Sequence, residues 1–186
     1  MSKEENSFKE KLHKGLGHVM AVIAVFLVLV VFGGAYYLVI APNLISKPFI
    51  PEPALPEDAL ERINNGEHVI NESHINYIIN EIGAYKLRNT WGTADYPVME
   101  FVLTDLEKKY HSFVENHLPI TKEKGAKEED IAIKGSQEVV VEILSAENTK
   151  AAVKKAIDEG KIQVDIVKDM NILARKGYLS IYDSIK

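Results

Sequence analysis

The chain has 186 residues, a formal net charge of -5 at pH 7 and no cysteine. The negative charge, without any dense block of Lys and Arg, argues against a nucleic-acid partner. The lack of cysteine excludes disulfides, thiol catalysis, zinc–thiolate sites and S-palmitoylation. Residues 57–186 are long enough to form one domain with its own hydrophobic core.

The first predicted element is an apolar helix from Val19 to Ala41, which contains no charged side chain. At a rise of about 1.5 Å per residue it would span roughly 35 Å, enough to cross a hydrocarbon core of about 30 Å. Two alternatives fit less well, because a buried core helix of this length would have a polar face and a cleaved signal peptide has a shorter apolar region. We therefore expect residues 19–41 to be a transmembrane anchor, with the lipid bilayer as a partner.

The flanking charges predict the orientation of this anchor. Lys9, Lys11 and Lys14 precede it, whereas Lys47 is the only basic residue between it and Arg62. Cytoplasmic flanks carry the excess of Lys and Arg. Residues 1–18 should therefore form a cytoplasmic tail, and the C-terminal domain should lie outside the cytoplasm at the cell membrane.

A proline-rich stretch follows, since residues 42–56 contain five of the seven prolines. Proline fixes the backbone and removes hydrogen-bond donors, so an extended, semi-rigid spacer is expected. Lys14-Gly15 before the apolar run also resembles the processing site of pilin-type precursors. Cleavage at Gly15 and a pilin-like filament subunit are therefore alternatives, although the prolines interrupt the long helix that a filament core needs.

Residues 57–186 alternate between helix and strand signals. Asn71 is a suitable N-cap, because its side chain can accept a hydrogen bond from the first turn of a helix. A later helix should be capped by Asn148 or Thr149, and the segment 139–141 would suit a strand as well as a helix. The predicted helices cover residues 57–63, 71–83, 137–145 and 148–160, and a last one, capped by Asp169, has an apolar stripe of Ala174, Tyr178, Ile181 and Ile185.

The predicted strands cover residues 98–104, 110–116, 131–135 and 161–167, the last with clean apolar–polar alternation. Residues 121–130 are charged and predict a solvated loop. Together these elements indicate an α+β domain with a largely antiparallel sheet.

The C-terminal half resembles sterol-carrier-protein-like lipid-binding domains. The resemblance lies in the strand Asp130-Ile131-Ala132-Ile133, the helix from Gln137, the strand entry Glu159-Gly160-Lys161-Ile162 and the closing helix. It implies a five-stranded sheet, helices over one face and an apolar tunnel for a lipid or fatty acyl ligand. The residues that would line this tunnel, or alternatively form a plain core, are Ile143, Leu144, Ile162, Val164, Leu173, Tyr178 and Ile181.

No motif for catalysis, a metal or a cofactor is present in the sequence. No two of the six histidines have the i, i+4 spacing of a helical metal site. Ser136 lacks the frame of a nucleophile elbow, and Trp91 is expected to cap the core or anchor a partner. We therefore expect a membrane-anchored, non-enzymatic domain that binds an apolar ligand. The alternatives are a tethered protein-interaction module in a cell-envelope complex and, less well supported, an envelope hydrolase.

Overall fold

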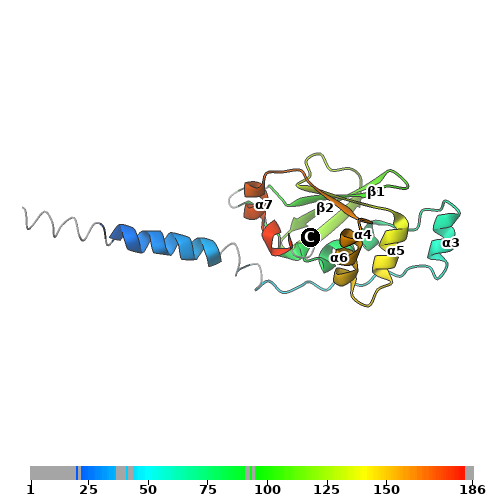
Figure 1. Cartoon of the computed structure of the whole chain (residues 1–186), viewed down its shortest axis with the longest axis horizontal. Coiled ribbons are helices and arrows are strands. Elements are labelled where there is room, and N and C mark those ends of the chain that lie inside the picture. Colours follow the sequence, from blue (N-terminus) through cyan, green and yellow to red (C-terminus); the bar gives the residue numbers. More distant parts are fainter. Residues whose placement is uncertain are drawn as a thin grey trace, which may run out of the picture.

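A computed structural model describes residues 20, 22–36, 41, 44–90, 93 and 95–182 of the chain. Residues 22–35 are helical, and their large apolar side chains are exposed, as in Phe26 and Phe32. No helix within the described residues is both long enough and apolar enough to cross a membrane. The predicted anchor, residues 19–41, lies partly outside these residues. The remainder of the described chain forms a small α+β domain (Figure 1).

A single five-stranded sheet organises this domain. The strand order is β3-β2-β1-β4-β5, in which β1 and β4 are parallel and the other three neighbouring pairs are antiparallel. The sheet is therefore largely antiparallel, as predicted. Its strands are β1 (Val98–Leu103), β2 (Lys108–Glu115), β3 (Leu118–Glu123), β4 (Ile131–Gly135) and β5 (Gln163–Ile166).

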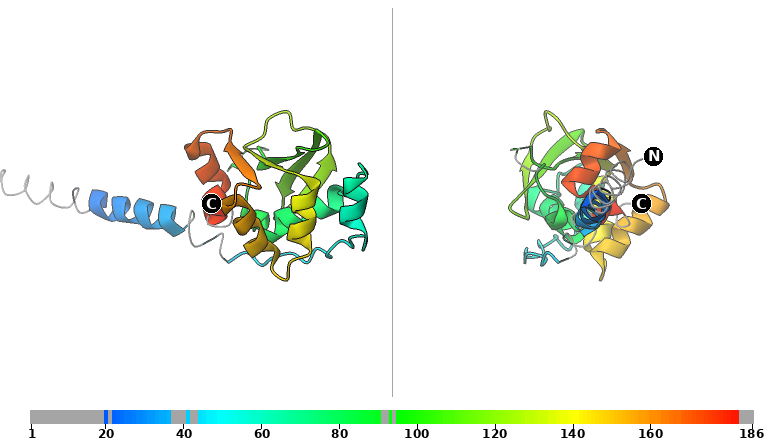
Figure 2. Two further views of the ribbon diagram at one scale, coloured as in Figure 1. Left: turned by 45° about the vertical axis from the view of Figure 1, so that its right-hand side comes forward. Right: turned by 90° about the vertical axis from the view of Figure 1, so that its left-hand side faces the viewer.

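Helices cover one face of the sheet (Figures 1 and 2). The alternation in β2 shows this, because Tyr110, Ser112 and Val114 are buried while the intervening side chains are not. A single cluster of buried apolar side chains fills the space between sheet and helices. The helices are α3 (Ala59–Asn64), α4 (Glu72–Glu81), α5 (Gln137–Leu144), α6 (Thr149–Asp158) and α7 (Met170–Lys176), with the short 3-10 helices η2 (Ala84–Lys86) and η3 (Tyr178–Ser180).

Local capping explains where several helices begin. The Asn71 side chain accepts hydrogen bonds from the backbone of Ser73 and His74, which confirms the predicted N-cap. Asn148, rather than Thr149, caps α6. Ser136 accepts a hydrogen bond from the backbone of Val139, and the segment that could have been a strand is therefore the helix α5.

Two sequence predictions were wrong. Residues 121–130 were expected to be a loop, but β3 extends to Glu123, and the Thr121 hydroxyl lies 2.8 Å from that of Ser112 on β2. The last helix was expected to continue past Tyr178, but Gly177 adopts φ +89°, in the left-handed region that ends helices. Ile185 and Trp91 lie outside the described residues.

The proline-rich stretch has no helix or strand, and it is docked on the domain. The Lys47 Nζ lies 2.6 Å from the carboxylate of Glu81, and the Asn80 side chain donates to the carbonyl of Pro48. Leu55 packs against the core. We call residues 47–56 the strap, because they run back along α4 toward α3 (Figure 1).

Candidate functional site

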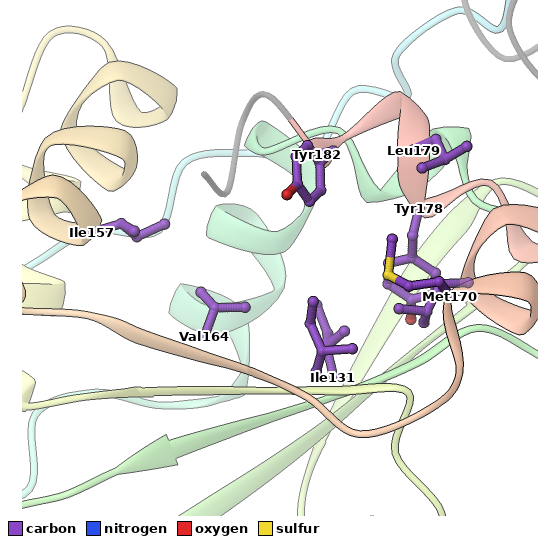
Figure 3. A pocket seen from close by; sticks show the side chains of 9 residues that line it. Ile131, Ile157, Val164, Met170, Tyr178, Leu179 and Tyr182 are labelled. Carbon is purple, nitrogen blue, oxygen red and sulfur yellow. The ribbon is translucent and has the colours of Figure 1, made fainter.

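An apolar cavity of about 230 Å³ lies on the helix-covered side of the sheet, between α6 and the C-terminal segment. Figure 3 shows Ile131 and Val164 forming its floor, with Ile157 on one side and Met170 on the other. Among the described residues that line it, none has a charged side chain. They are Ile131, Ile157, Val164, Ile166, Met170, Leu173, Tyr178, Leu179 and Tyr182.

The floor of the cavity follows from the pairing of β4 with β5. Ile131 lies opposite Ile166, and Ile133 lies opposite Val164. Side chains that are directly opposite in a sheet point to the same face. The alternating apolar positions of β5 are therefore all on the helix side, where the gap between α6 and α7 leaves Val164 and Ile166 incompletely covered.

Gly177 determines the shape of the far wall. Its positive φ stops α7 and redirects the chain into η3, so that Tyr178 and Leu179 come over the cavity. A Cβ at this position would also lie 3.3 Å from the backbone oxygen of Lys86. A residue other than glycine would therefore be strained here on both counts.

Tyr178 presents its ring to the cavity while its hydroxyl is bonded elsewhere. The hydroxyl lies 3.1 Å from Asp130 Oδ2 and 3.2 Å from the carbonyl oxygen of Val98, and it can donate its proton to either. Burial, and then the negative charge of Asp130, raise the pKa of Tyr178 well above its ordinary value. The side chain is therefore neutral and adds no charge to the cavity wall.

A buried ion pair fixes this wall to the sheet. Asp130 is fully buried, and its carboxylate accepts hydrogen bonds from the backbone of Val98 and from Lys176 Nζ, each at 2.8 Å. Lys176 Nζ also donates to the carbonyl of Tyr96 and lies 2.8 Å from Asp95 Oδ1. The end of α7 and the start of η3 are thus attached to the beginnings of β1 and β4.

Three of the residues predicted to line a tunnel do line this cavity: Val164, Leu173 and Tyr178. The other four lie in the hydrophobic core, and each is at most 4% exposed: Ile143, Leu144, Ile162 and Ile181. The strand alternation that singled out Val164 also marks Ile166. In contrast, the sequence gives no sign of Met170, Leu179 or Tyr182, because their positions depend on the turn at Gly177.

The cavity is open on one side, and the side chains that border the opening are apolar. Ile166, Met170 and Leu179 are 54%, 50% and 46% exposed, although all three contribute to the lining. Apolar side chains that remain exposed around a hollow are typical of a binding surface.

A larger hollow of about 710 Å³ lies on the opposite, uncovered face of the sheet. Its lining combines the aromatic rings of Tyr96 and Phe113, which pack edge to face, with charged side chains such as Lys124 and Glu128. It suits an apolar ligand less well than the first cavity. Among the residues that the structure describes, no group of three or more His, Asp or Glu could hold a metal ion.

Comparison with known proteins gives no family for the chain. No family model matches it, and no curated protein does. A search of solved structures finds the inverting sec-alkylsulfatase Pisa1 of a Pseudomonas species, with 17% identity over 45% of this chain and a TM-score of 0.31. It also finds the ubiquinone synthesis protein UbiJ-SCP2, with 10% identity over 48% of this chain and a TM-score of 0.32.

A double mutant of the same sulfatase is similar at 16% identity, over 50% of this chain, with a TM-score of 0.30. The matched region covers 13% and 14% of the two sulfatase chains and 71% of the UbiJ-SCP2 chain. All three TM-scores are below 0.5, so these likenesses carry no argument about this chain. The functional argument depends on the cavity itself.

Proposed function

We propose that this protein is a membrane-anchored, non-enzymatic domain that binds a lipid-like or other apolar ligand in the cavity beside Val164 and Tyr178. The observation that carries the proposal is that the described side chains lining the cavity are all uncharged and that those bordering its opening are apolar. Binding there would remove apolar surface from water on both ligand and protein, which is the main source of affinity for such ligands.

The size of the cavity limits what it can hold. At about 230 Å³ it exceeds the ~150 Å³ of an engineered cavity that binds benzene, but it is smaller than the ~300–1,000 Å³ of pockets for drug-sized ligands. It therefore fits a ring or a section of an acyl chain. The remainder of a lipid would extend out through the open rim.

Residues 19–41 supply the anchor in this proposal. The run has no charged side chain, and within it the described helical residues 22–35 expose their apolar side chains instead of packing them in the core. Such a surface is stable in hydrocarbon and costly in water. The excess of Lys before the run supports a cytoplasmic N-terminus and an extracytoplasmic domain.

The test uses the full-length chain in lipid nanodiscs, irradiated in the presence of a fatty acid that carries a diazirine. The anchor, which shares the bilayer with the fatty acid, should also be labelled. Within the domain, we expect the crosslinked peptides to come from residues 157–182 and from the peptide that contains Ile131. Val164→Trp should fill the cavity and remove most of this labelling, because a tryptophan occupies much of the available space. Val102→Trp is the matched control, since Val102 lies on β1 and points to the opposite face of the sheet.

Four outcomes would contradict the proposal. Labelling spread evenly over the domain, or labelling unchanged in Val164→Trp, would show that the cavity is not the binding site. Recovery of a chemically altered fatty acid from a sample kept in the dark would show a reaction and contradict the non-enzymatic part. A chain that is not retained with the nanodiscs would contradict the anchor.

A second candidate function is a tethered protein-interaction module that acts as an accessory subunit of a cell-envelope complex. The uncovered face of the sheet favours it, because the hollow there exposes Tyr96 and Phe113 beside Lys122, whose Nζ lies 5.8 Å from the Phe113 ring centroid. Aromatic and cationic side chains of this kind are enriched at protein interfaces. Phe113→Ala should weaken capture of a protein partner and leave the fatty-acid labelling unchanged.

A further inference from the structure

Exposed apolar side chains gather at the end of the domain where the cavity opens. The strand pairing defines this end: β1, β3 and β4 begin there, and β2 and β5 end there. Ile166 and Val167 lie at the end of β5, and Met170 and Leu179 follow on the connected segment. Their exposed fractions are 54%, 50%, 50% and 46%. We call these four residues the rim.

The strap joins the domain at the same end. Lys47 is paired with Glu81, the last residue of α4, and the carbonyl of Pro48 accepts from the Asn80 side chain next to it. The chain beyond α4 packs near the cavity wall, since a Cβ on Gly83 would lie 3.2 Å from the side chain of Ile181, just after η3. The chain from the apolar run therefore reaches the domain beside the rim.

The connection between the apolar run and the strap is short. Five residues lie between Ala41 and Lys47, so even a fully extended chain spans only about 20 Å from one to the other. Figure 1 shows the helix of residues 22–35 leaving from the end of the domain that carries α7, and α3 at the far end. The right-hand view of Figure 2, along that helix, brings α7 and the C-terminal segment to the front.

We infer that the rim rests on the surface of the bilayer, so that the cavity exchanges its ligand directly with the membrane. This inference rests on the anchor in the proposed function. A docked strap and a short connection hold the open side of the cavity near the headgroups, and the four rim side chains give that side an apolar contact surface. An acyl chain could then pass from lipid to cavity without crossing water, where each exposed methylene is unfavourable.

The lack of native cysteine allows a clean test in the full-length chain. Leu179→Cys and Met170→Cys would each be labelled with an environment-sensitive fluorophore and reconstituted in nanodiscs that contain a lipid with a nitroxide on its headgroup. The matched control is Leu60→Cys on α3, because Leu60 is 47% exposed and lies at the opposite end of the domain. A label on Ile23→Cys reports the anchor, and fatty-acid labelling reports the cavity.

We expect strong nitroxide quenching at positions 170 and 179, little at position 60, and access of aqueous iodide in the reverse order. Equal quenching at positions 60 and 179, with the anchor label in lipid and the cavity still taking fatty acid, would overturn the inference and leave the proposed function intact. Protection of position 179 from iodide without nitroxide quenching would indicate a protein cover and also overturn it. If the anchor label stays in water, both fail.

Discussion

Replacing Asp130 by asparagine tests the role of the buried ion pair. The change removes the charge that faces Lys176 but keeps an oxygen that can accept from the backbone of Val98. Removing one partner of a buried pair typically costs about 3–5 kcal/mol, because the other charge remains buried. Asp95, with a 55% exposed side chain, still lies beside Lys176, so we expect the lower end, about 3 kcal/mol.

The assay is thermal and urea unfolding of the full-length chain, followed by far-UV circular dichroism. For a domain of this size, a loss of about 3 kcal/mol lowers Tm by roughly 11 °C. Lys176→Met should cost a similar amount. The double variant Asp130→Asn with Lys176→Met removes both charges, so neither of them remains buried alone. Its cost should therefore be at least about 1.5 kcal/mol below the sum of the single costs.

The control is Asp165→Asn, which breaks the exposed ion pair with Lys134. Pairs of this kind contribute about 0–1 kcal/mol. The reasoning would be refuted if Asp130→Asn cost no more than Asp165→Asn. It would also be refuted if the two single costs added fully in the double variant, since the buried charges would then not depend on each other.

Three further predictions concern the anchor, the cavity wall and acid sensitivity. The double variant Leu29→Lys with Val30→Lys should abolish membrane integration, because each mid-membrane charge costs about 2.5–3.5 kcal/mol on insertion scales. Vesicle flotation measures this, and unchanged flotation would contradict the anchor. Gly177→Ala should cost about 1–2 kcal/mol in urea unfolding, because an alanine is strained at φ +89°. The same variant should weaken fatty-acid labelling. A stability cost near zero would contradict the strain. Burial lowers the pKa of His74, so the unfolded chain binds the proton more readily and stability should fall as pH drops below about 6.5. His74→Gln, which can keep the capping box, should reduce this pH dependence of the urea midpoint, and an unchanged dependence would assign it to other groups.

Local signals in the sequence were sufficient where one turn of chain determines the structure. The N-cap at Asn71 is an example, because the groups that it satisfies lie two and three residues away. Strand β3 was missed because its second half is charged and contains Lys122 and Glu123, as is common for a strand at the edge of a sheet. Its pairing with β2 depends on the tertiary fold.

The candidate site was predictable to the same limited extent. Val164 follows from strand alternation, but the rim residue Leu179 comes over the cavity only because Gly177 breaks the last helix. The pairing of Asp130 with Lys176, 46 residues apart, leaves no local pattern. The anchor, its orientation and the resemblance to sterol-carrier proteins are still predictions from the sequence.

The docked strap also determines how far the domain can move from its attachment point. The strap runs along α4 from the rim end to α3. While its ten residues remain bound, they add nothing to the distance between the domain and its attachment point. If residues 47–56 were released, an extended proline-rich segment would add about 30 Å of reach at roughly 3.1 Å per residue. The attachment would then shift to α3 at the opposite end, which would free the open side of the cavity to turn outward. The contacts of Lys47 and Pro48 with α4 therefore keep the domain from using this additional reach.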